Sequence, residues 1–562
     1  MNNRKRNLLF IAFSILCTLV FVYPYLVKDF LPLEHDTLFH LSRIEGLAQS
    51  FKDGEFIARI YPYKNMSFGY ASPLFYSDFF LIIPALLYNF GMSIVTCYKL
   101  ILLITTFLSC FFAMKLVSKI SLNEFAPYLG GVLYLFNNYR ITDVYVRGAL
   151  GEVMGFIFLP LVLLGIYYLL YDDETKWHYL VLGFGGLALT HNITFVLACI
   201  LFLFFIILRF KFLLQNKNRI KSILFAVLIT FLLTAFFTLP MLEQLKSQDF
   251  YLNYYTSSSS MTSYTLPLWK YFTNTTVFGY GSNDMSKELS MVLNIGYFLM
   301  FVPLLYLLKK KKDQPFVLHC LIIGYILLLL PINLLPWNYF FMFSLIQFPW
   351  RLLMISSLCL IIPASIAPFQ FNWNKKIIAL SCIGILLLEG IWHILPVMNR
   401  TSGITSKTEY SQLIDGSMID PFYSATYVRV ELAGADYLPS GSPDYRYITT
   451  EVTDENQVPV HSIQTRKGTT LTIDNLEPNR TYILPVTYYK GYQVYSVNNE
   501  TNKLEKIKTY QAPNTLVGFD GNNSSSYVLK YVPTFIQTSS LFISIFTLFI
   551  IIVIKLKKSL HK

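Results

Sequence analysis

Two carboxylates, two imidazoles and one guanidinium fall between Glu34 and Arg43, directly after the first apolar stretch of the chain. Ionisable side chains at the edge of an apolar segment are costly, and they concentrate where chemistry takes place. A carboxylate there can take a proton from an incoming hydroxyl while nearby cations hold an anionic leaving group. We take Asp36, or else Glu34, as the candidate general base. The candidate phosphate-binding groups of this segment are His35, His40 and Arg43.

The segment from Asp36 to Lys52 is predicted to form an amphipathic helix lying on a membrane, because its apolar residues recur every three or four positions. Asp36 would lie near the helix start, where the helix dipole favours a carboxylate, and His40 and Arg43 would share a face with it. The alternative is that Asp36 only caps the helix and His40 lies at the membrane interface.

A second group of charged residues lies in a short loop, and this loop must approach the first group if the apolar stretches form one bundle. Arg147 could clamp a phosphate there, beside Asp143. Glu152 opens the next apolar stretch, and its alternative role is that of a carboxylate favoured by a helix start.

Two further candidates lie at the ends of other apolar stretches. His191 follows Thr190 and precedes Asn192, so it could line a polar pocket or be a hydrogen-bonded structural residue. Arg351 begins a stretch at the end where a positive charge gains nothing from the helix dipole. It therefore needs an anionic partner, such as Asp36, Glu152 or a ligand phosphate.

The composition indicates a polytopic membrane protein. Of the 562 residues 54% are hydrophobic and 14% are charged, and many apolar runs approach the length that crosses a bilayer. The net charge of +12 is placed largely in short loops, where Lys and Arg set orientation, so nucleic-acid binding is not expected. The seven cysteines include no CxxC pair and lie in or beside apolar runs, which indicates neither a disulfide framework nor a cysteine metal site.

The basic loops predict about twelve spans with both termini in the cytoplasm. In this arrangement the segment from Pro73 to Phe90 does not cross but lies at the outer interface as a helix. A break at His191 divides the long apolar run 178–208, and the polar clusters then gather on the outer side. The predicted spans are 7–27, 95–114, 123–138, 152–170, 178–190, 193–208, 221–242, 291–308, 315–335, 352–370, 376–395 and 536–554.

Beyond Asn399 the pattern changes to the alternation of strands, which predicts an extracytoplasmic β-sandwich-like domain that serves as a wall, lid or partner surface. We therefore expect a transmembrane domain at 1–395 with outer juxtamembrane helices at 36–90, a β-rich domain at 396–535, and a last helix with a basic tail at 536–562. A Tyr-rich loop with Ser257 to Ser260 is expected to be a flexible connector or a cover for an outer cleft. The predicted strands are 445–452, 469–473, 481–486 and 527–532.

Metal and nucleotide sites have weak signals. His35 and His40 are five residues apart and HExxH is absent, so zinc is not expected. Asp36 and Glu152 could hold Mg²⁺ or Mn²⁺ loosely against a diphosphate. The chain has neither a P-loop nor a Rossmann fingerprint, so direct use of nucleotide energy is not expected.

The succession HDTLFHLSRIEGL, FGYASPLFY, DVYVRGALGE, LTHN and QFPWR resembles the bacterial multispanning proteins called 6-pyruvoyl-tetrahydropterin synthase-related membrane proteins. The resemblance covers roughly residues 8–400. The layout is similar to that of the GT-C class of glycosyltransferases, which have an acidic residue in the first outer loop. The soluble pterin synthase uses a zinc-binding histidine set that this chain lacks, so its chemistry is not implied.

The resemblance implies a membrane glycosyltransferase that moves a sugar from a polyprenyl-phosphate donor to a glycan or glycolipid acceptor of the cell envelope. Asp36, or else Glu34, matches the first-loop acid that acts as general base in GT-C enzymes. One alternative is a transporter or flippase for a lipid-linked sugar or polymer, although the interiors of the predicted spans are poor in the ionisable groups it would need. Another is a non-catalytic scaffold for cell-wall polymer synthesis.

Overall fold

The computed structural model describes residues 3–32, 34–253, 265–272, 293–308, 314–335, 337, 345–371, 373–398, 404, 435–498, 501 and 503–560. The chain divides into two compact units. The first comprises 1–38, 95–231 and 256–406, and the second comprises 39–94, 232–255 and 407–562. The serines 257–260 lie outside the described residues. So do the lysines 309–312, which form one of the basic loops behind the predicted topology.

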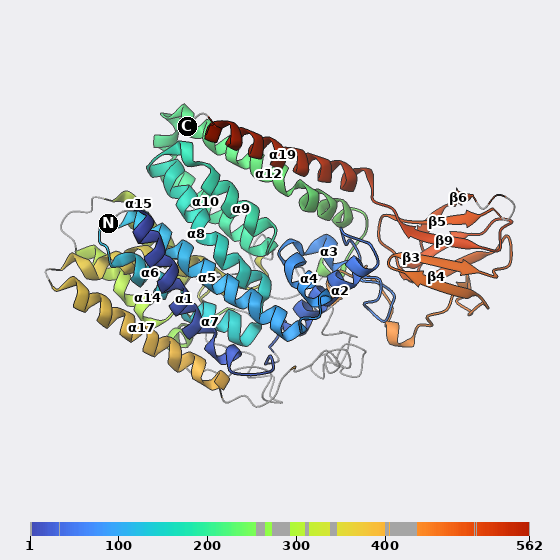
Figure 1. The fold of residues 1–562 in the computed structure, drawn as a ribbon, viewed down its shortest axis with the longest axis horizontal. Coiled ribbons are helices and arrows are strands. Elements are labelled where there is room, and N and C mark those ends of the chain that lie inside the picture. The colour runs from blue at the N-terminus through green and yellow to red at the C-terminus, as the bar shows by residue number, and fades with distance from the viewer. Residues whose placement is uncertain are drawn as a thin grey trace. The chain divides into compact units, whose positions relative to one another are not determined.

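The first unit is helical (Figure 1). Its two most buried long helices each carry a candidate site residue at their start, Glu152 in the first turn of α8 and Arg351 directly before α16. In the most apolar 18-residue stretch of α8, 89% is buried within the protein. In the corresponding stretch of the helical segment that contains α16, 94% is buried. α8 packs on α9 and α16 packs on α15. The helices of this unit are α1 (Asn3–Leu26), α5 (Ile94–Ile120), α6 (Ala126–Leu135), α7 (Asn138–Thr142), α8 (Leu150–Tyr171), α9 (His178–Ala188), α10 (Asn192–Leu208), α11 (Phe210–Leu214), the first part of α12 (Lys217–Leu245), α14 (Tyr297–Phe301), α15 (Pro315–Leu329), α16 (Leu352–Ile366) and α17 (Lys375–Met398).

Close packing between α8 and α9 depends on a glycine. A Cβ atom at Gly165 would lie 2.5 Å from the backbone nitrogen of Leu180, so a larger residue would force the two helices apart. Small residues allow such close approach between membrane helices. This packing fixes α8, whose first turn carries Glu152.

Within the described residues, seven helices are long and apolar enough to cross a membrane. The other five predicted spans coincide with shorter helices or, at 291–308, with α14 and the 3₁₀ turn that follows it. The break predicted within 178–208 is confirmed, because α9 ends at Ala188 and α10 begins at Asn192. The seven candidate spans are Arg4–Leu26, Ile94–Ile120, Leu150–Tyr171, Lys217–Leu245, Pro349–Gln370, Lys375–Leu395 and Phe535–Lys557.

The second unit joins short helices to the C-terminal sheets. A helix at the predicted position is confirmed as α2 (Thr37–Lys52), which lies in this unit from Phe39 onward. Nearly all of its residues are buried within the protein, so its amphipathic placement on a membrane surface stays a prediction. The segment expected to form one interfacial helix forms two instead, α3 (Ser72–Phe75) and α4 (Ile82–Asn89), with a 3₁₀ turn before α4. The prediction of a single helix was wrong, because the backbone of Tyr76 adopts an extended conformation that ends α3.

The last helix, α19 (Phe535–Leu560), runs beside the end of α12 (Figure 1). The hydroxyl of Ser544 donates to the carbonyl of Leu232 at 2.8 Å and accepts from the backbone N–H of Phe236 at 3.0 Å. A hydroxyl that bonds a neighbouring helix backbone is a common link between membrane helices.

The C-terminal strands form two antiparallel sheets, of order β1-β4-β8-β7 and β2-β3-β9-β5-β6. Figure 1 labels β3, β9, β5 and β6 of the second sheet. Side chains of both sheets share one buried core, for example Leu484 and Phe519 from one sheet and Val494 and Leu529 from the other. This is the predicted β-sandwich-like domain. Its strands are β1 (Thr453–Asp454), β2 (Ile463–Lys467), β3 (Thr470–Asp474), β4 (Thr481–Thr487), β5 (Tyr492–Val497), β6 (Leu504–Lys506), β7 (Thr509–Gln511), β8 (Leu516–Asp520) and β9 (Tyr527–Tyr531).

Three of the four predicted strands are confirmed as β3, β4 and β9. The strand predicted at 445–452 is wrong, since the chain forms a 3₁₀ turn at Tyr445–Tyr447. The buried ring of Tyr445 packs on Phe68, with ring centroids 4.8 Å apart, and its hydroxyl lies 3.0 Å from the hydroxyl of Thr487. Tyr445 is therefore held by its side chain rather than by a strand ladder.

Candidate functional site

Glu34, one of the two candidate bases, is already engaged in the first loop. Its side chain is 1% exposed. The hydroxyl of Tyr25 donates to Oε1 at 3.0 Å and that of Thr37 donates to Oε2 at 2.6 Å. These contacts fix the conformation of the loop that leads into α2, so the role of Glu34 is structural.

Asp36 differs from Glu34 because its carboxylate has no hydrogen-bond or ion-pair partner within the described part of the chain. The side chain is partly exposed and does not cap α2. Its backbone N–H donates to the carbonyl of Arg147 at 2.8 Å, so the two charged loops do meet, as predicted. Burial raises the pKa of Asp36, while the guanidinium groups of Arg147 and Arg351 act in the opposite direction.

A glycine allows the contact between the two loops. Gly148 has a left-handed φ of +58°, and a Cβ atom there would lie 2.7 Å from Oγ1 of Thr37 and 3.0 Å from Cβ of Glu34. Glycine adopts this backbone conformation without steric cost. Arg147 just before it is therefore carried on a π-helical turn, Asp143–Arg147, directly against the first loop.

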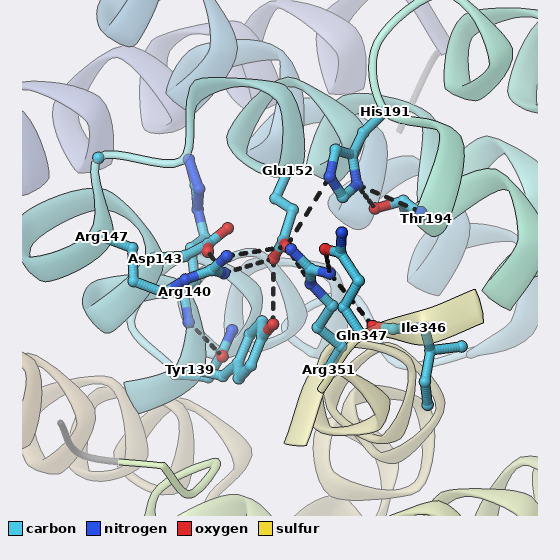
Figure 2. A network of polar contacts seen from close by, with 12 residues as sticks. Tyr139, Arg140, Asp143, Arg147, Glu152, His191, Thr194, Ile346, Gln347 and Arg351 are labelled. Atoms are coloured by element: carbon cyan, nitrogen blue, oxygen red, sulfur yellow. Dashed lines mark hydrogen bonds and ion pairs between the residues drawn. The ribbon is translucent and has the colours of Figure 1, made fainter. Parts of the chain in front are cut away.

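Glu152, in the first turn of α8, is the centre of a polar network (Figure 2). Arg147 donates to both of its oxygens, Nη1 to Oε2 at 2.7 Å and Nη2 to Oε1 at 3.1 Å. Arg351 donates from Nε to Oε1 at 2.6 Å, and the hydroxyl of Tyr139 donates to Oε2 at 3.1 Å. Bidentate guanidinium contacts of this kind fix geometry as well as charge. Glu152 thus combines the helix-start position with a role in the network.

Arg147 also has a second carboxylate and an aromatic neighbour. Its Nη1 donates to Asp143 Oδ1, and its guanidinium lies 4.7 Å from the ring centroid of Trp350. Oδ2 of the fully buried Asp143 has no partner in the part of the chain that is described. Burial and the neighbouring Glu152 raise the pKa of Asp143 well above its ordinary value, against the effect of Arg147.

His191 is the N-cap of α10. Its Nδ1 accepts from the backbone N–H of Thr194 at 3.2 Å, which places the ring proton on Nε2 in the neutral form. Nε2 lies 4.0 Å from Oε1 of Glu152 (Figure 2). The histidine is therefore a helix cap that turns its N–H toward the network, so the two predicted roles coincide.

Arg351 has the anionic partner that its position requires, namely Glu152. Its Nη1 donates to the carbonyl of Ile346 at 3.1 Å and to Oε1 of Gln347 at 2.6 Å. Its Nη2 makes no hydrogen bond with another described residue and is not among the buried unpaired atoms, so it is open to solvent or ligand.

Arg43 and His40 belong to the second unit, where their contacts are structural. Asp78 lies 2.8 Å from Nε and 2.6 Å from Nη2 of Arg43. Nη2 also donates to the carbonyl of Ser77 at 2.7 Å, and Nη1 lies 3.2 Å from Nδ1 of the buried His40. The guanidinium lies 3.9 Å from the ring centroid of Tyr76. Arg43, expected as a phosphate contact, thus has its charge compensated within its own unit.

Three residues in the first unit were not predicted to take part. Tyr139 bonds Glu152, Gln347 bonds Arg351, and Trp350 packs on Arg147 (Figure 2 labels the first two). Gln347 and Trp350 were visible in the QFPWR motif beside Arg351, which was the available signal. His35 is partly exposed, and its backbone N–H lies 3.4 Å from the carbonyl of Val146.

The donor set does not fit a divalent metal held between Asp36 and Glu152. Both oxygens of Glu152 are already occupied by guanidinium and phenol donors, which a metal would have to displace. The described residues also contain no group of three or more His, Cys, Asp or Glu side chains placed to hold an ion.

Comparison with known proteins shows a distant likeness but no family. No family model matches the chain. A protein of Lactococcus lactis subsp. cremoris (strain MG1363), described as uncharacterized, is 25% identical over 259 residues. The match covers 44% of this chain and 41% of that protein, so the chain spans less than half the length of the relative. This likeness carries no activity over to the chain.

Proposed function

We propose that the chain is an integral-membrane glycosyltransferase of GT-C-like architecture. It moves a sugar from a polyprenyl-phosphate donor to an envelope glycan or glycolipid on the outer face of the cell membrane. The observation that supports this best is the carboxylate of Asp36, which has no partner among the described residues and belongs to a loop that bonds the backbone of Arg147. Arg147 and Arg351 both bind Glu152 next to it. A free base next to bound cations is the arrangement such a transfer requires.

In this proposal Asp36 takes the proton of the acceptor hydroxyl. The acceptor oxygen bonds to the anomeric carbon of the sugar as the bond between that carbon and the phosphate oxygen breaks. The lipid phosphate leaves with the electron pair, and Arg147 and Arg351 stabilise its charge. A raised pKa suits Asp36 to this role, because a base works best when its pKa approaches the working pH.

The proposed topology is the twelve-span arrangement with both termini in the cytoplasm and the β-rich domain outside. The seven long apolar helices support a multi-pass protein. The five shorter helices at the other predicted positions would complete the count if each crosses with its flanking residues. Basic residues near the chain ends, such as Arg4 and Lys555, favour a cytoplasmic location.

The decisive experiment is Asp36→Asn in the full chain, reconstituted in vesicles with a radiolabelled polyprenyl-phosphate sugar. We expect transfer to fall by about 10²-fold or more, as for the loss of a general base. Membrane insertion and folding should be unchanged, since the carboxylate has no partner among the described residues. Glu124→Gln, which changes an exposed carboxylate, is the matched control. Transfer at the wild-type rate in Asp36→Asn would remove this residue from the mechanism.

A further inference from the structure

Gln347 has a backbone conformation that side chains rarely adopt. Its φ is +60°, in the left-handed region that favours glycine. Strained residues of this kind persist where surrounding contacts hold them, and they concentrate at ligand sites. The backbone N–H of Phe348 donates to the carbonyl of Ile346 at 2.7 Å and closes a tight turn around Gln347, and the side chain of Gln347 bonds Arg351, 2.6 Å from Oε1 to Nη1.

This bond fixes which way the carboxamide of Gln347 faces. A guanidinium only donates, so the atom of Gln347 that meets Nη1 must be the carbonyl oxygen. The amide nitrogen Nε2, with two N–H groups, is then turned away from Arg351 Nη1. It has no partner among the residues that the structure describes, and the side chain is partly exposed. Figure 2 shows the carboxamide beside the Arg351 guanidinium.

The neighbouring groups give this free donor a preferred ligand. Nη2 of Arg351 also has no hydrogen-bond partner among the described residues, so an uncharged donor and a cationic donor lie on adjacent side chains. Arg147 is a second cation nearby, because Arg147 and Arg351 both bind Glu152. Donors next to guanidinium groups favour an anionic oxygen over a neutral one, because the charge strengthens each bond.

We propose that Nε2 of Gln347 and Nη2 of Arg351 together bind a phosphate oxygen of the lipid donor, which makes Gln347 a substrate-binding residue. This inference rests on the proposed function, because the donor is the lipid phosphate named there. The hydrogen bond to Glu152 fixes the guanidinium of Arg351, and that guanidinium fixes the carboxamide of Gln347. The strained backbone of Gln347 places this carboxamide just before the start of α16.

Binding of undecaprenyl phosphate to the full chain in nanodiscs tests the inference without any transfer reaction. Gln347→Glu keeps an oxygen for Arg351 but replaces the amide donor with a negative charge. We expect it to weaken binding by about 10-fold or more, the effect of losing a hydrogen bond to a charged group. Gln347→Ala should also weaken binding. Gln511→Glu, which places the same charge on an exposed strand of the β-rich domain, should bind as the wild type does.

Two probes separate the lipid from its phosphate. Undecaprenol, which lacks the phosphate, should bind the wild type and Gln347→Glu equally, and inorganic phosphate should compete with undecaprenyl phosphate for the wild type. Equal binding of undecaprenyl phosphate by Gln347→Glu, Gln347→Ala and the wild type would overturn the inference. A thermal unfolding midpoint unchanged from the wild type would show that any loss of binding is not a loss of folding.

The outcomes also distinguish this inference from the proposed function. If Asp36→Asn abolishes transfer while the Gln347 variants bind undecaprenyl phosphate normally, the proposed function is supported and the proposed role of Gln347 is wrong. If binding depends on Gln347 while Asp36→Asn transfers normally, the phosphate site stands and the assignment of the base fails.

Discussion

The two arginine clusters of this protein are built from the same residue types but differ in what they leave unpaired. In the second unit every nitrogen of Arg43 has a partner, supplied by Asp78, His40 and Ser77. In the described part of the first unit, Nη2 of Arg351, Nε2 of Gln347 and the carboxylate of Asp36 have no hydrogen-bond partner. The side chains of Asp36 and Gln347 are partly exposed, so a ligand can reach their open atoms, whereas the guanidinium of Arg43 is buried among its protein partners.

The comparison teaches that burial and charge alone do not identify a site. Both clusters contain a buried arginine paired with a carboxylate and packed on an aromatic ring. The cluster around Arg43 has the composition of a site but the connections of a structural link. The cluster around Glu152 holds its arginines in place while leaving donors for a ligand.

The largest stability effect should come from Asp78→Asn, because it leaves Arg43 buried without its counter-charge. We expect a loss of about 3–5 kcal/mol in the free energy of unfolding. The double variant Arg43→Met with Asp78→Asn should recover part of this loss, since it removes the unpaired charge. The free energies of unfolding of the single and the double variant can be measured in detergent, with circular dichroism as the probe. Transfer per folded molecule should stay near the wild-type value, and a selective loss of transfer would make this cluster part of the site.

Arg351→Lys should give the opposite pattern in the first unit. Lysine keeps the positive charge but cannot reproduce the contacts to Glu152, Ile346 and Gln347 at once. We expect the KM for the lipid donor to rise by about 10-fold, with a smaller loss of stability than in Asp78→Asn. Donor titration of the reconstituted variant provides the measurement. An unchanged KM accompanied by a large loss of stability would place Arg351 with Arg43 as a structural residue.

Local sequence patterns predicted several elements of the fold well. The helix at Thr37–Lys52, the break at His191 and strands β3, β4 and β9 follow from periodicity and polarity over a few residues. The need of Arg351 for an anionic partner followed from the helix dipole, and Glu152 meets it across 199 residues of sequence.

The choice of partners could not be predicted, because tertiary packing decides it. Asp78, a residue of a broken helix, compensates Arg43 across 35 residues of sequence, and no spacing rule identifies this pair. The sequence does not distinguish the carboxylates of Glu34 and Asp36. In the structure the hydroxyls of Tyr25 and Thr37 donate hydrogen bonds to Glu34 and not to Asp36. Packing also turned the alternating residues at 445–452 into a 3₁₀ turn with a buried tyrosine.

The pH dependence of transfer should sharpen the role of Asp36. A base must be ionised, so activity should fall as the pH drops through its pKa. Burial raises that pKa, and the acid limb should lie above the value of about 4 expected for an ordinary aspartate. Arg147 lowers the pKa of Asp36, so Arg147→Met should move the limb to higher pH. A profile of kcat against pH measures both shifts, and a limb unmoved by Arg147→Met would contradict the electrostatic link.

The smallest expected effects come from two matched tyrosines, each of which donates its hydroxyl to a buried carboxylate. Tyr61 bonds Asp78 in the second unit and Tyr139 bonds Glu152 in the first. Tyr61→Phe and Tyr139→Phe should each lower the free energy of unfolding by about 1.5–3 kcal/mol, the worth of a hydrogen bond to a charged group. Only Tyr139→Phe should also reduce transfer, because the freed Glu152 can draw Arg147 and Arg351 away from the donor phosphate. Unfolding and transfer measured on the same preparations test the pair, and equal transfer by the two variants would show that both clusters are structural.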